Sequence, residues 1–157
     1  MNPFGRVLVP HDFSTHATAA LRAAARLVAP GGRIVVLHVV VPFMPVTDIP
    51  PAGISTYIAP SELLEGAGKQ LKRLLEKTLP SRGGVRVDAK VEIGDPYQRI
   101  IATSRGMDAI IMSTAGRTGL AHLLIGSVTE KVVRHSTIPV VTLRPEAARK
   151  MAKAAKR

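Results

Sequence analysis

The sequence predicts an α/β fold with an open five-stranded parallel sheet and helices on both of its faces. Apolar runs alternate along the chain with segments of helical periodicity, as in successive βαβ units. The run at 34–41 is almost continuously apolar, which is typical of a central parallel strand buried on both faces. A chain of 157 residues with 46% hydrophobic residues suits one domain. We assign that domain to residues 1–145 and a basic tail to residues 146–157.

Five strands are expected, at residues 6–10, 33–41, 85–93, 108–114 and 139–143. The third alternates apolar and polar residues strictly, so one of its faces must meet water and we place it at an edge of the sheet. The fifth is short and apolar.

Segments with helical periodicity fill the connections between these strands. The first covers about 14–28 and ends before the turn sequence Ala29-Pro30-Gly31-Gly32. The second covers about 61–79, and the residues on its apolar face are expected in the core: Leu63, Ala67, Leu71, Leu74 and Leu75.

Start signals mark the other two helices. Asp95 suits the N-cap of the third helix, with Pro96 in its first turn and Gln98 at the capping-box position. The fourth helix is expected from Ser127 to about 136, because Ser127 and Glu130 have the spacing of a capping box.

The connection between the fourth strand and the fourth helix is a candidate phosphate site. Gly116 and Gly126 lack a Cβ, so the backbone there can turn tightly and approach an anion closely. The donors and the dipole at the start of the helix near Ser127 favour negative charge. The loop does not end in the Lys-Ser/Thr pair of a Walker P-loop, so hydrolysis would at most be slow.

Residues 42–60 contain five prolines and no periodicity. We interpret this segment as a mobile loop near the carboxyl edge of the sheet, which could close as a lid.

The net charge of +11 is unevenly distributed, since six basic residues and one acidic residue follow position 143. The favoured interpretation of the tail is a solvated, partly helical extension, and the alternative is an electrostatic arm for nucleic acid or an acidic partner. Aromatic residues make up 3% of the chain, so base stacking has little support and nucleic acid is not an expected partner.

The chain has no cysteine, which excludes disulfides and thiolate metal sites and fits a cytoplasmic protein. No apolar run approaches the roughly 20 residues that a membrane span needs, so no membrane association is expected. The five histidines have no metal-ligand spacing, and His38, within an apolar strand, is expected as a hydrogen-bonded core residue.

The chain resembles the universal stress protein family through motifs that occur in matching order across residues 5–145. They are Val9-Pro10-His11-Asp12-Phe13-Ser14, Leu37-His38-Val39, Gly94-Asp95-Pro96 and Ile138-Pro139-Val140-Val141, together with the glycine loop. ATP-binding members have glycine, two residues, glycine, nine residues, glycine and then Ser or Thr. Here Gly116 and Gly126-Ser127 take the second and third places, and Ser113 takes the first. The resemblance implies a Rossmann-like sheet of order 3-2-1-4-5, as in the adenine nucleotide alpha hydrolases.

The resemblance also implies an adenine-nucleotide site, with ATP as the ligand and Mg²⁺ held through its phosphates. Asp12 would hydrogen-bond the ribose, although the same residue could serve only as a turn residue or helix N-cap. Val39 would contact adenine or simply belong to the core, and Pro10 and His11 would border the base. The phosphates would lie near Ser113, Gly116, Gly126, Ser127 and Val128, with Arg117 as a cationic partner.

The leading hypothesis for function is a stress-response module whose ATP occupancy is read by partner proteins. The alternative is a nucleotide-free interaction protein, in which Ser113 and Ala115 mark a lost phosphate site. A slow ATPase is a third hypothesis. Members of the family with this pattern form homodimers through the last strand, which predicts a two-fold dimer through residues 139–143.

Overall fold

One five-stranded sheet organises the chain, and all of its neighbouring strands are parallel. The computed structural model describes residues 4–42, 60–79, 84–115, 125–144, 146, 147 and 150. The strand order is β3-β2-β1-β4-β5, as predicted. The elements in chain order are β1 (Phe4–Pro10), α1 (Thr15–Leu27), β2 (Val28–Val40), α2 (Pro60–Thr78), β3 (Arg86–Ile93), α3 (Pro96–Thr103), β4 (Ala109–Ser113), α4 (Ser127–His135) and β5 (Val140–Leu143).

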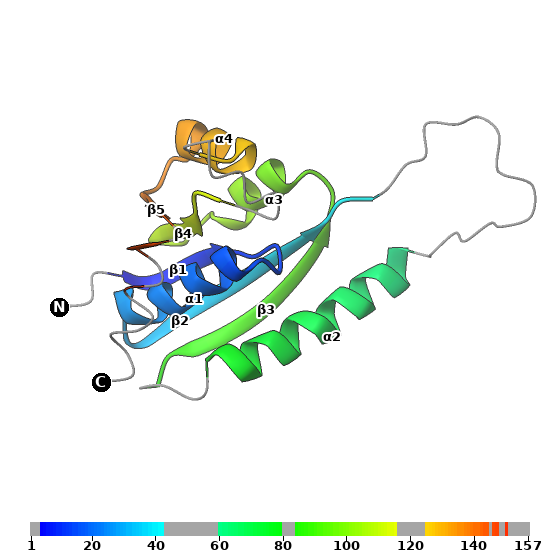
Figure 1. Cartoon of the computed structure of the whole chain (residues 1–157), viewed down its shortest axis with the longest axis horizontal. Coiled ribbons are helices and arrows are strands. Elements are labelled where there is room, and N and C mark those ends of the chain that lie inside the picture. The colour runs from blue at the N-terminus through cyan, green and yellow to red at the C-terminus, as the bar shows by residue number, and fades with distance from the viewer. Residues whose placement is uncertain are drawn as a thin grey trace, which may run out of the picture.

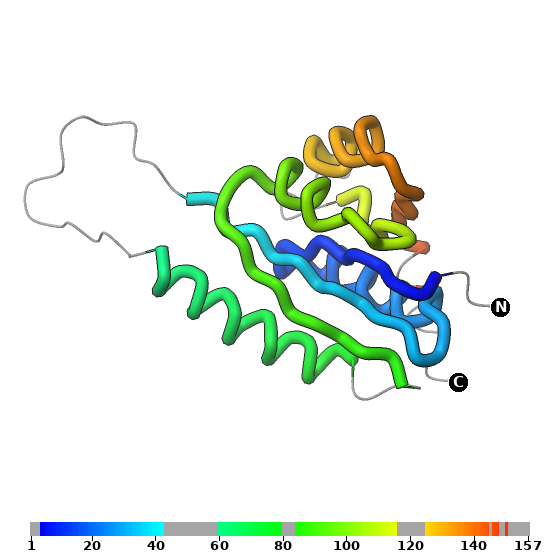
Figure 2. Tube along the Cα trace, turned by 180° about the vertical axis from the view of Figure 1, so that it is seen from behind, coloured from blue at the N-terminus to red at the C-terminus, as the bar shows by residue number. Residues whose placement is uncertain are grey.

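Helices α1 and α2 cover one face of the sheet, and α3 and α4 cover the other (Figure 1, Figure 2). The side chains of β1 alternate between the two layers. Val7 and Val9 pack with Leu21 and Leu71 on the α1/α2 face. Leu8 packs with residues of α3 and α4 on the other face. The central strands are therefore buried on both sides, which is why their sequences are almost continuously apolar.

Side-chain caps start α1 and α3, and the cap at Asp95 is the one that the sequence predicts. The Ser14 hydroxyl accepts a hydrogen bond from the Ala17 amide at 3.0 Å. The Asp95 carboxylate accepts one from the Gln98 amide at 2.9 Å, and Pro96 is the first residue of the helix. Each cap satisfies a backbone donor that has no partner within the helix.

The turn expected at residues 29–32 is part of a strand in the structure. Strand β2 begins at Val28, directly after α1, and Phe4 pairs with Val28 while Arg6 pairs with Arg33. The extra residues of β2 are accommodated as an irregularity in this ladder. Residues 29–32 lie between these two register pairs, and Gly31 has a φ of 77°, the left-handed conformation that glycine adopts in turns, so the Pro-Gly-Gly sequence bends the chain within the irregularity.

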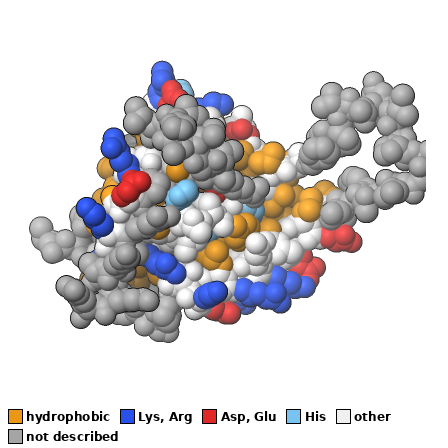
Figure 3. Space-filling model, in the orientation of Figure 1, with side chains coloured by type: hydrophobic (Ala, Val, Ile, Leu, Met, Phe, Trp, Pro, Cys, Tyr) orange, Lys and Arg blue, Asp and Glu red, His pale blue; other side chains and the backbone are white. Residues whose placement is uncertain are grey.

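The apolar face of α2 meets the core in its second half. Leu71 and Leu75 are buried, and Leu74 packs against the same cluster. Leu63 and Ala67 were expected in the core but are half-buried, and they line a surface cleft. Acidic and basic side chains lie side by side over this helix (Figure 3), where Glu65 and Lys69 form an exposed pair.

Strand β3 lies at one edge of the sheet and β5 at the other, in agreement with the prediction. Most of the proline-rich segment at 42–60 and most of the basic tail at 146–157 lie outside the described residues. No helix in the described parts of the chain has the length and apolar character needed to cross a bilayer.

Gly32 provides a test of the α1–β2 junction. A Cβ added there would lie 2.5 Å from Val28 Cγ1, 2.6 Å from the Gly5 oxygen and 2.8 Å from the Ala29 oxygen. Two of these three contacts are with backbone, which cannot easily move, so Gly32→Ala should lower the free energy of unfolding by about 1–3 kcal/mol. The measurement is urea unfolding followed by circular dichroism.

Gly68→Ala is the matched control. Gly68 lies within α2, and a Cβ added there meets no atom within 4 Å. Alanine favours a helix over glycine, so this variant should be more stable by about 0.5–1 kcal/mol. Equal effects of the two substitutions would show that the α1–β2 junction is not tightly packed.

Candidate functional site

Strands β1 and β4 separate at their carboxyl ends. Within the described strands, they pair at Val7 with Ala109 and at Leu8 with Ile110. Beyond these positions β1 stays paired with β2 as far as Pro10, whereas β4 stays paired with β5 to its end. The chain then leaves β1 for α1 on one face and β4 for α4 on the other (Figure 1). Ligands of open α/β sheets bind where the strand order reverses in this way.

Pro10, His11 and Asp12 form the rim of this crevice on the β1 side. Pro10 is half-buried and lies two residues after Leu8, so its side chain is on the same face of the sheet, toward α3 and α4. One carboxylate oxygen of Asp12 accepts a hydrogen bond from the Ser14 amide at 3.0 Å. Asp12 is therefore a turn residue, and Ser14 rather than Asp12 is the N-cap. A carboxylate accepts several hydrogen bonds, so this bond is compatible with ribose hydroxyls as further donors.

The imidazole of His11 turns away from the crevice, toward α1, and is 3% exposed. Its Nδ1 accepts a hydrogen bond from the Phe13 amide at 3.0 Å. The ring proton is therefore on Nε2, which donates to the Thr18 hydroxyl at 3.2 Å. That hydroxyl donates in turn to the Ser14 carbonyl. The side chain of His11 thus does not fill the side of the crevice that Pro10 borders.

Burial lowers the pKa of His11 from 6.5 to about 4. The Asp12 carboxylate acts in the opposite direction, and His38 adds to the lowering. The hydrogen bonds agree with this direction, because a second proton on Nδ1 would displace the Phe13 amide. His11 is therefore neutral at neutral pH.

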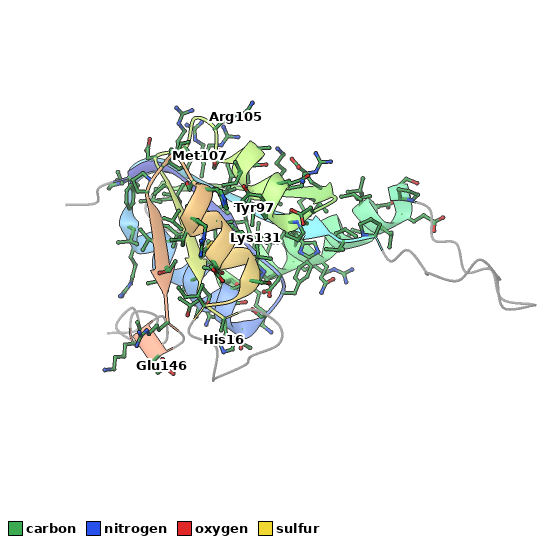
Figure 4. All side chains as sticks on the ribbon, turned by 90° about the horizontal axis from the view of Figure 1, so that it is seen from above. His16, Tyr97, Arg105, Met107, Lys131 and Glu146 are labelled. Atoms are coloured by element: carbon green, nitrogen blue, oxygen red, sulfur yellow. The ribbon has the colours of Figure 1, made fainter. Side chains whose placement is uncertain are left out.

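Val39 of β2 and Val128 of α4 pack against the same cluster on the α3/α4 face. Figure 4, which looks down on this side, labels Tyr97 of α3 and Lys131 of α4, with His16 of α1 apart from them. The apolar surface expected next to adenine thus shares one face of the sheet with the first turn of α4.

Ser113 ends β4 and is buried, with its side chain on the other face of the sheet, where Ile111 packs. Its hydroxyl accepts a hydrogen bond from the Ala115 amide at 3.2 Å and donates to the Leu143 carbonyl at 3.4 Å. The Cβ that distinguishes Ser113 from glycine therefore points away from the face that carries Val39 and Val128.

The predicted capping box at Ser127 is wrong. Gly126 is the N-cap of α4, and no side chain caps this helix within the described residues. A capping box needs Glu or Gln three residues after the N-cap. With Gly126 as the N-cap that position is Thr129, so Glu130 lies one residue beyond it. It pairs instead with Arg134 at 2.8 Å.

The start of α4 is held against the end of β4 by two hydrogen bonds. The Gly126 amide donates to the Thr114 carbonyl at 2.8 Å, and the Thr129 hydroxyl donates to the Ser113 carbonyl at 3.1 Å. The Glu130 amide donates to the Gly126 carbonyl, so the amides of residues 127–129 precede the first intrahelical bond. Such donors can bind an anion.

Two of the expected site residues, Gly116 and Arg117, lie outside the described residues. Those that are described fall at the carboxyl ends of the sheet and at the start of α4: Pro10, His11, Asp12, Val39, Ser113, Gly126, Ser127 and Val128. In the described ranges, no group of three or more His, Asp or Glu residues could hold a metal ion.

A cleft of about 850 Å³ opens on the α1/α2 face. It is lined by Asp12 and Phe13 from the β1–α1 turn, by His38 from β2 and by Leu63 and Ala67 from α2, among others. Sequence reasoning did not anticipate this cleft. Asp12 lines this cleft but Val39, Gly126 and Ser127 do not, so the cleft lies on the other side of the sheet from the apolar surface expected next to adenine.

Sequence reasoning also missed the conformation of Phe13. Its φ is 65°, in the left-handed region that glycine and asparagine usually occupy, and nothing in the local sequence signals it. His38 was expected as a satisfied core residue, and this is confirmed. It is 5% exposed, and its Nδ1 donates to the His11 carbonyl at 2.8 Å.

Comparison with known proteins identifies relatives over nearly the whole domain. The model of the universal stress protein family matches residues 3–144. A universal stress protein of Thermus aquaticus is 30% identical over 147 residues, which cover 90% of this chain and 99% of that protein.

Solved structures share the fold. A universal stress protein of Methanocaldococcus jannaschii superposes with a TM-score of 0.68 at 26% identity, covering 89% of this chain and 95% of its own. A universal stress protein family protein of Arabidopsis thaliana, solved with AMP bound, gives a TM-score of 0.57 at 21% identity. That match covers 88% of this chain and 90% of the plant protein.

The burial of neutral His11 predicts a dependence of stability on pH. Between pH 6.5 and about 4 the unfolded chain binds a proton at this position that the folded chain excludes. The contribution is fully present above pH 6.5 and disappears as the pH falls to 4, a total of about 3 kcal/mol. Urea unfolding across this range measures it.

His11→Asn is the comparison, because asparagine keeps an acceptor near the position of Nδ1 and does not titrate. The variant should lose about 3 kcal/mol less than the wild type between the two pH values. Identical losses in both proteins would mean that other groups cause the acid sensitivity.

Proposed function

The chain belongs to the universal stress protein family, and on this premise we propose that it binds an adenine nucleotide where β1 and β4 separate. One observation carries the proposal. The Asp12 carboxylate follows the end of β1, and the first turn of α4, beside the end of β4, has no side-chain cap within the described residues. Hydroxyl donors suit the first group, and a phosphate suits the second.

The base and ribose belong at the β1–β2 side in this proposal. The half-buried Pro10 and Val39 offer apolar surface on the α3/α4 face, and Asp12 follows at the end of β1. The side chain of His11 is bound to α1, so only its backbone would border the base. These features fit the group without a steric conflict from His11.

The phosphates belong at the first turn of α4. The amides of residues 127–129 precede the first intrahelical hydrogen bond. A Cβ on Gly126 would lie 3.4 Å from the Thr114 oxygen, so glycine allows β4 and α4 to approach closely. The carboxylate of Glu130 is engaged by Arg134, which limits its repulsion of a phosphate.

The ligand we propose is ATP, with Mg²⁺ bound through its phosphates. AMP in the Arabidopsis thaliana relative supports the adenosine part of this choice. Occupancy would be read by partner proteins in a cytoplasmic stress response, with at most slow hydrolysis. If no ATP binds up to millimolar concentration while the chain stays folded, the nucleotide-free interaction protein becomes the better hypothesis.

Asp12→Asn tests the ribose contact. Asparagine keeps an oxygen for the Ser14 amide, so the turn is preserved, but it replaces charge-assisted hydrogen bonds to the ribose with neutral ones. The affinity for AMP and for ATP, measured by isothermal titration calorimetry, should fall about tenfold.

Asp88→Asn is the matched control. Asp88 is a half-exposed carboxylate on β3 that pairs with Arg33. Its substitution should leave the affinity unchanged. An unchanged affinity in Asp12→Asn as well would remove Asp12 from the site without excluding nucleotide binding.

We also propose a two-fold homodimer through residues 139–143. Strand β5 is an edge strand, and Val140, Val141 and Thr142 are only half-buried in the single chain. Pairing of two such edges would satisfy their outer backbone groups. Size-exclusion chromatography with light scattering should give about twice the 16.7 kDa of one chain. A single-chain mass at micromolar concentration would contradict the dimer.

A further inference from the structure

The turn between β1 and α1 contains a strained residue. Phe13 has a φ of 65°, and of the residues that the structure describes it alone has a positive φ without being glycine. A bulky side chain disfavours this region, because its Cβ crowds the backbone. Such a conformation persists where the surroundings impose it, and it often occurs at functional sites.

Two histidines impose the conformation of Phe13. Its amide donates to His11 Nδ1 at 3.0 Å. Its ring packs against the ring of His38, with centroids 4.3 Å apart, and meets the edge of the His11 ring at 5.9 Å. The turn is therefore held at both the backbone and the side chain of Phe13.

His38 links this turn to the sheet. It belongs to β2, and its Nδ1 donates to the His11 carbonyl at 2.8 Å, while the His11 amide donates to the Leu37 carbonyl at 2.8 Å. Both polar groups of the His11 backbone are thus bound to β2. The bond from His38 is buried, and it is also the reason that a polar residue suits this apolar strand.

Asp12 lies between the two anchored residues. Its neighbours, His11 and Phe13, are fixed by His38, and its own carboxylate accepts the Ser14 amide. The direction of the Asp12 side chain is thus set by contacts that begin at β2.

We propose that His38 is a positioning residue for the nucleotide site, since it holds His11 and Phe13 so that Asp12 is presented to a ribose. The inference rests on the proposed function and adds to it a residue that does not itself contact the ligand. Preorganisation of this kind raises affinity, because the turn need not be ordered when the ligand binds.

Two substitutions at His38 separate positioning from packing. His38→Leu fills the core but removes the donor to the His11 carbonyl. His38→Asn can supply an amide donor near the position of Nδ1. Calorimetric titration with AMP, at a temperature where circular dichroism shows every variant folded, should give about a tenfold loss of affinity for leucine. Asparagine should restore most of it. If the leucine variant does not fold, Phe13→Leu removes the ring contact at the same turn and should weaken AMP binding likewise.

His135→Leu is the matched control. The Nδ1 of His135 also bonds to a carbonyl at 2.8 Å, that of Lys131, but it lies exposed at the end of α4. Its loss should leave AMP affinity unchanged. If the His38 variants bind AMP with the same affinity as the wild type, the positioning role is overturned and the proposed function is not. A wild-type chain that binds no adenine nucleotide would overturn the proposed function and this inference with it.

Discussion

After β1 the chain turns to one face of the sheet, and after β4 it turns to the other. The rest of the structure depends on this constraint. Right-handed βαβ connections send α1 and α2 to one face and α3 and α4 to the other, with β1 and β4 adjacent in the middle. Within the part of the chain that the structure describes, the register of these two strands ends at Leu8 and Ile110. The crevice follows from topology, and side chains only decide what it can hold.

The two sides of the crevice are stabilised in different ways. On the β4 side, the Thr129 hydroxyl binds the carbonyl of Ser113 at the end of β4, and the Gly126 amide binds that of Thr114, the next residue, which fixes the start of α4. On the β1 side, a strained Phe13 is held by hydrogen bonds and ring contacts from His11 and His38. The strain occurs in the turn that carries Asp12, and the buried His38 contacts this turn from β2, where a function would account for the cost of both.

Side chains of β4 alternate between the two faces of the sheet, and this decides what a serine does in the first glycine place of the family pattern. Ser113 stands in the first glycine place, yet its hydroxyl bonds to Leu143 and Ala115 on the α1/α2 face. In a strand, successive side chains point to opposite faces, so a Cβ at this position does not occupy the α3/α4 face. The His11 side chain likewise does not occupy the α3/α4 face, because its imidazole is bound to α1.

The sequence alone determined the order of elements, the edge position of β3 and the cap at Asp95, because these depend on periodicity and on residues close in the chain. Tertiary structure decided the rest. Pairs with β1 at Val28 and Arg33 extended β2 across residues 29–32, the N-cap of α4 fell at Gly126 instead of Ser127, and His11 and His38 hold the left-handed Phe13. Each of these outcomes depends on contacts between residues that are distant in the sequence, and local sequence patterns do not predict such contacts.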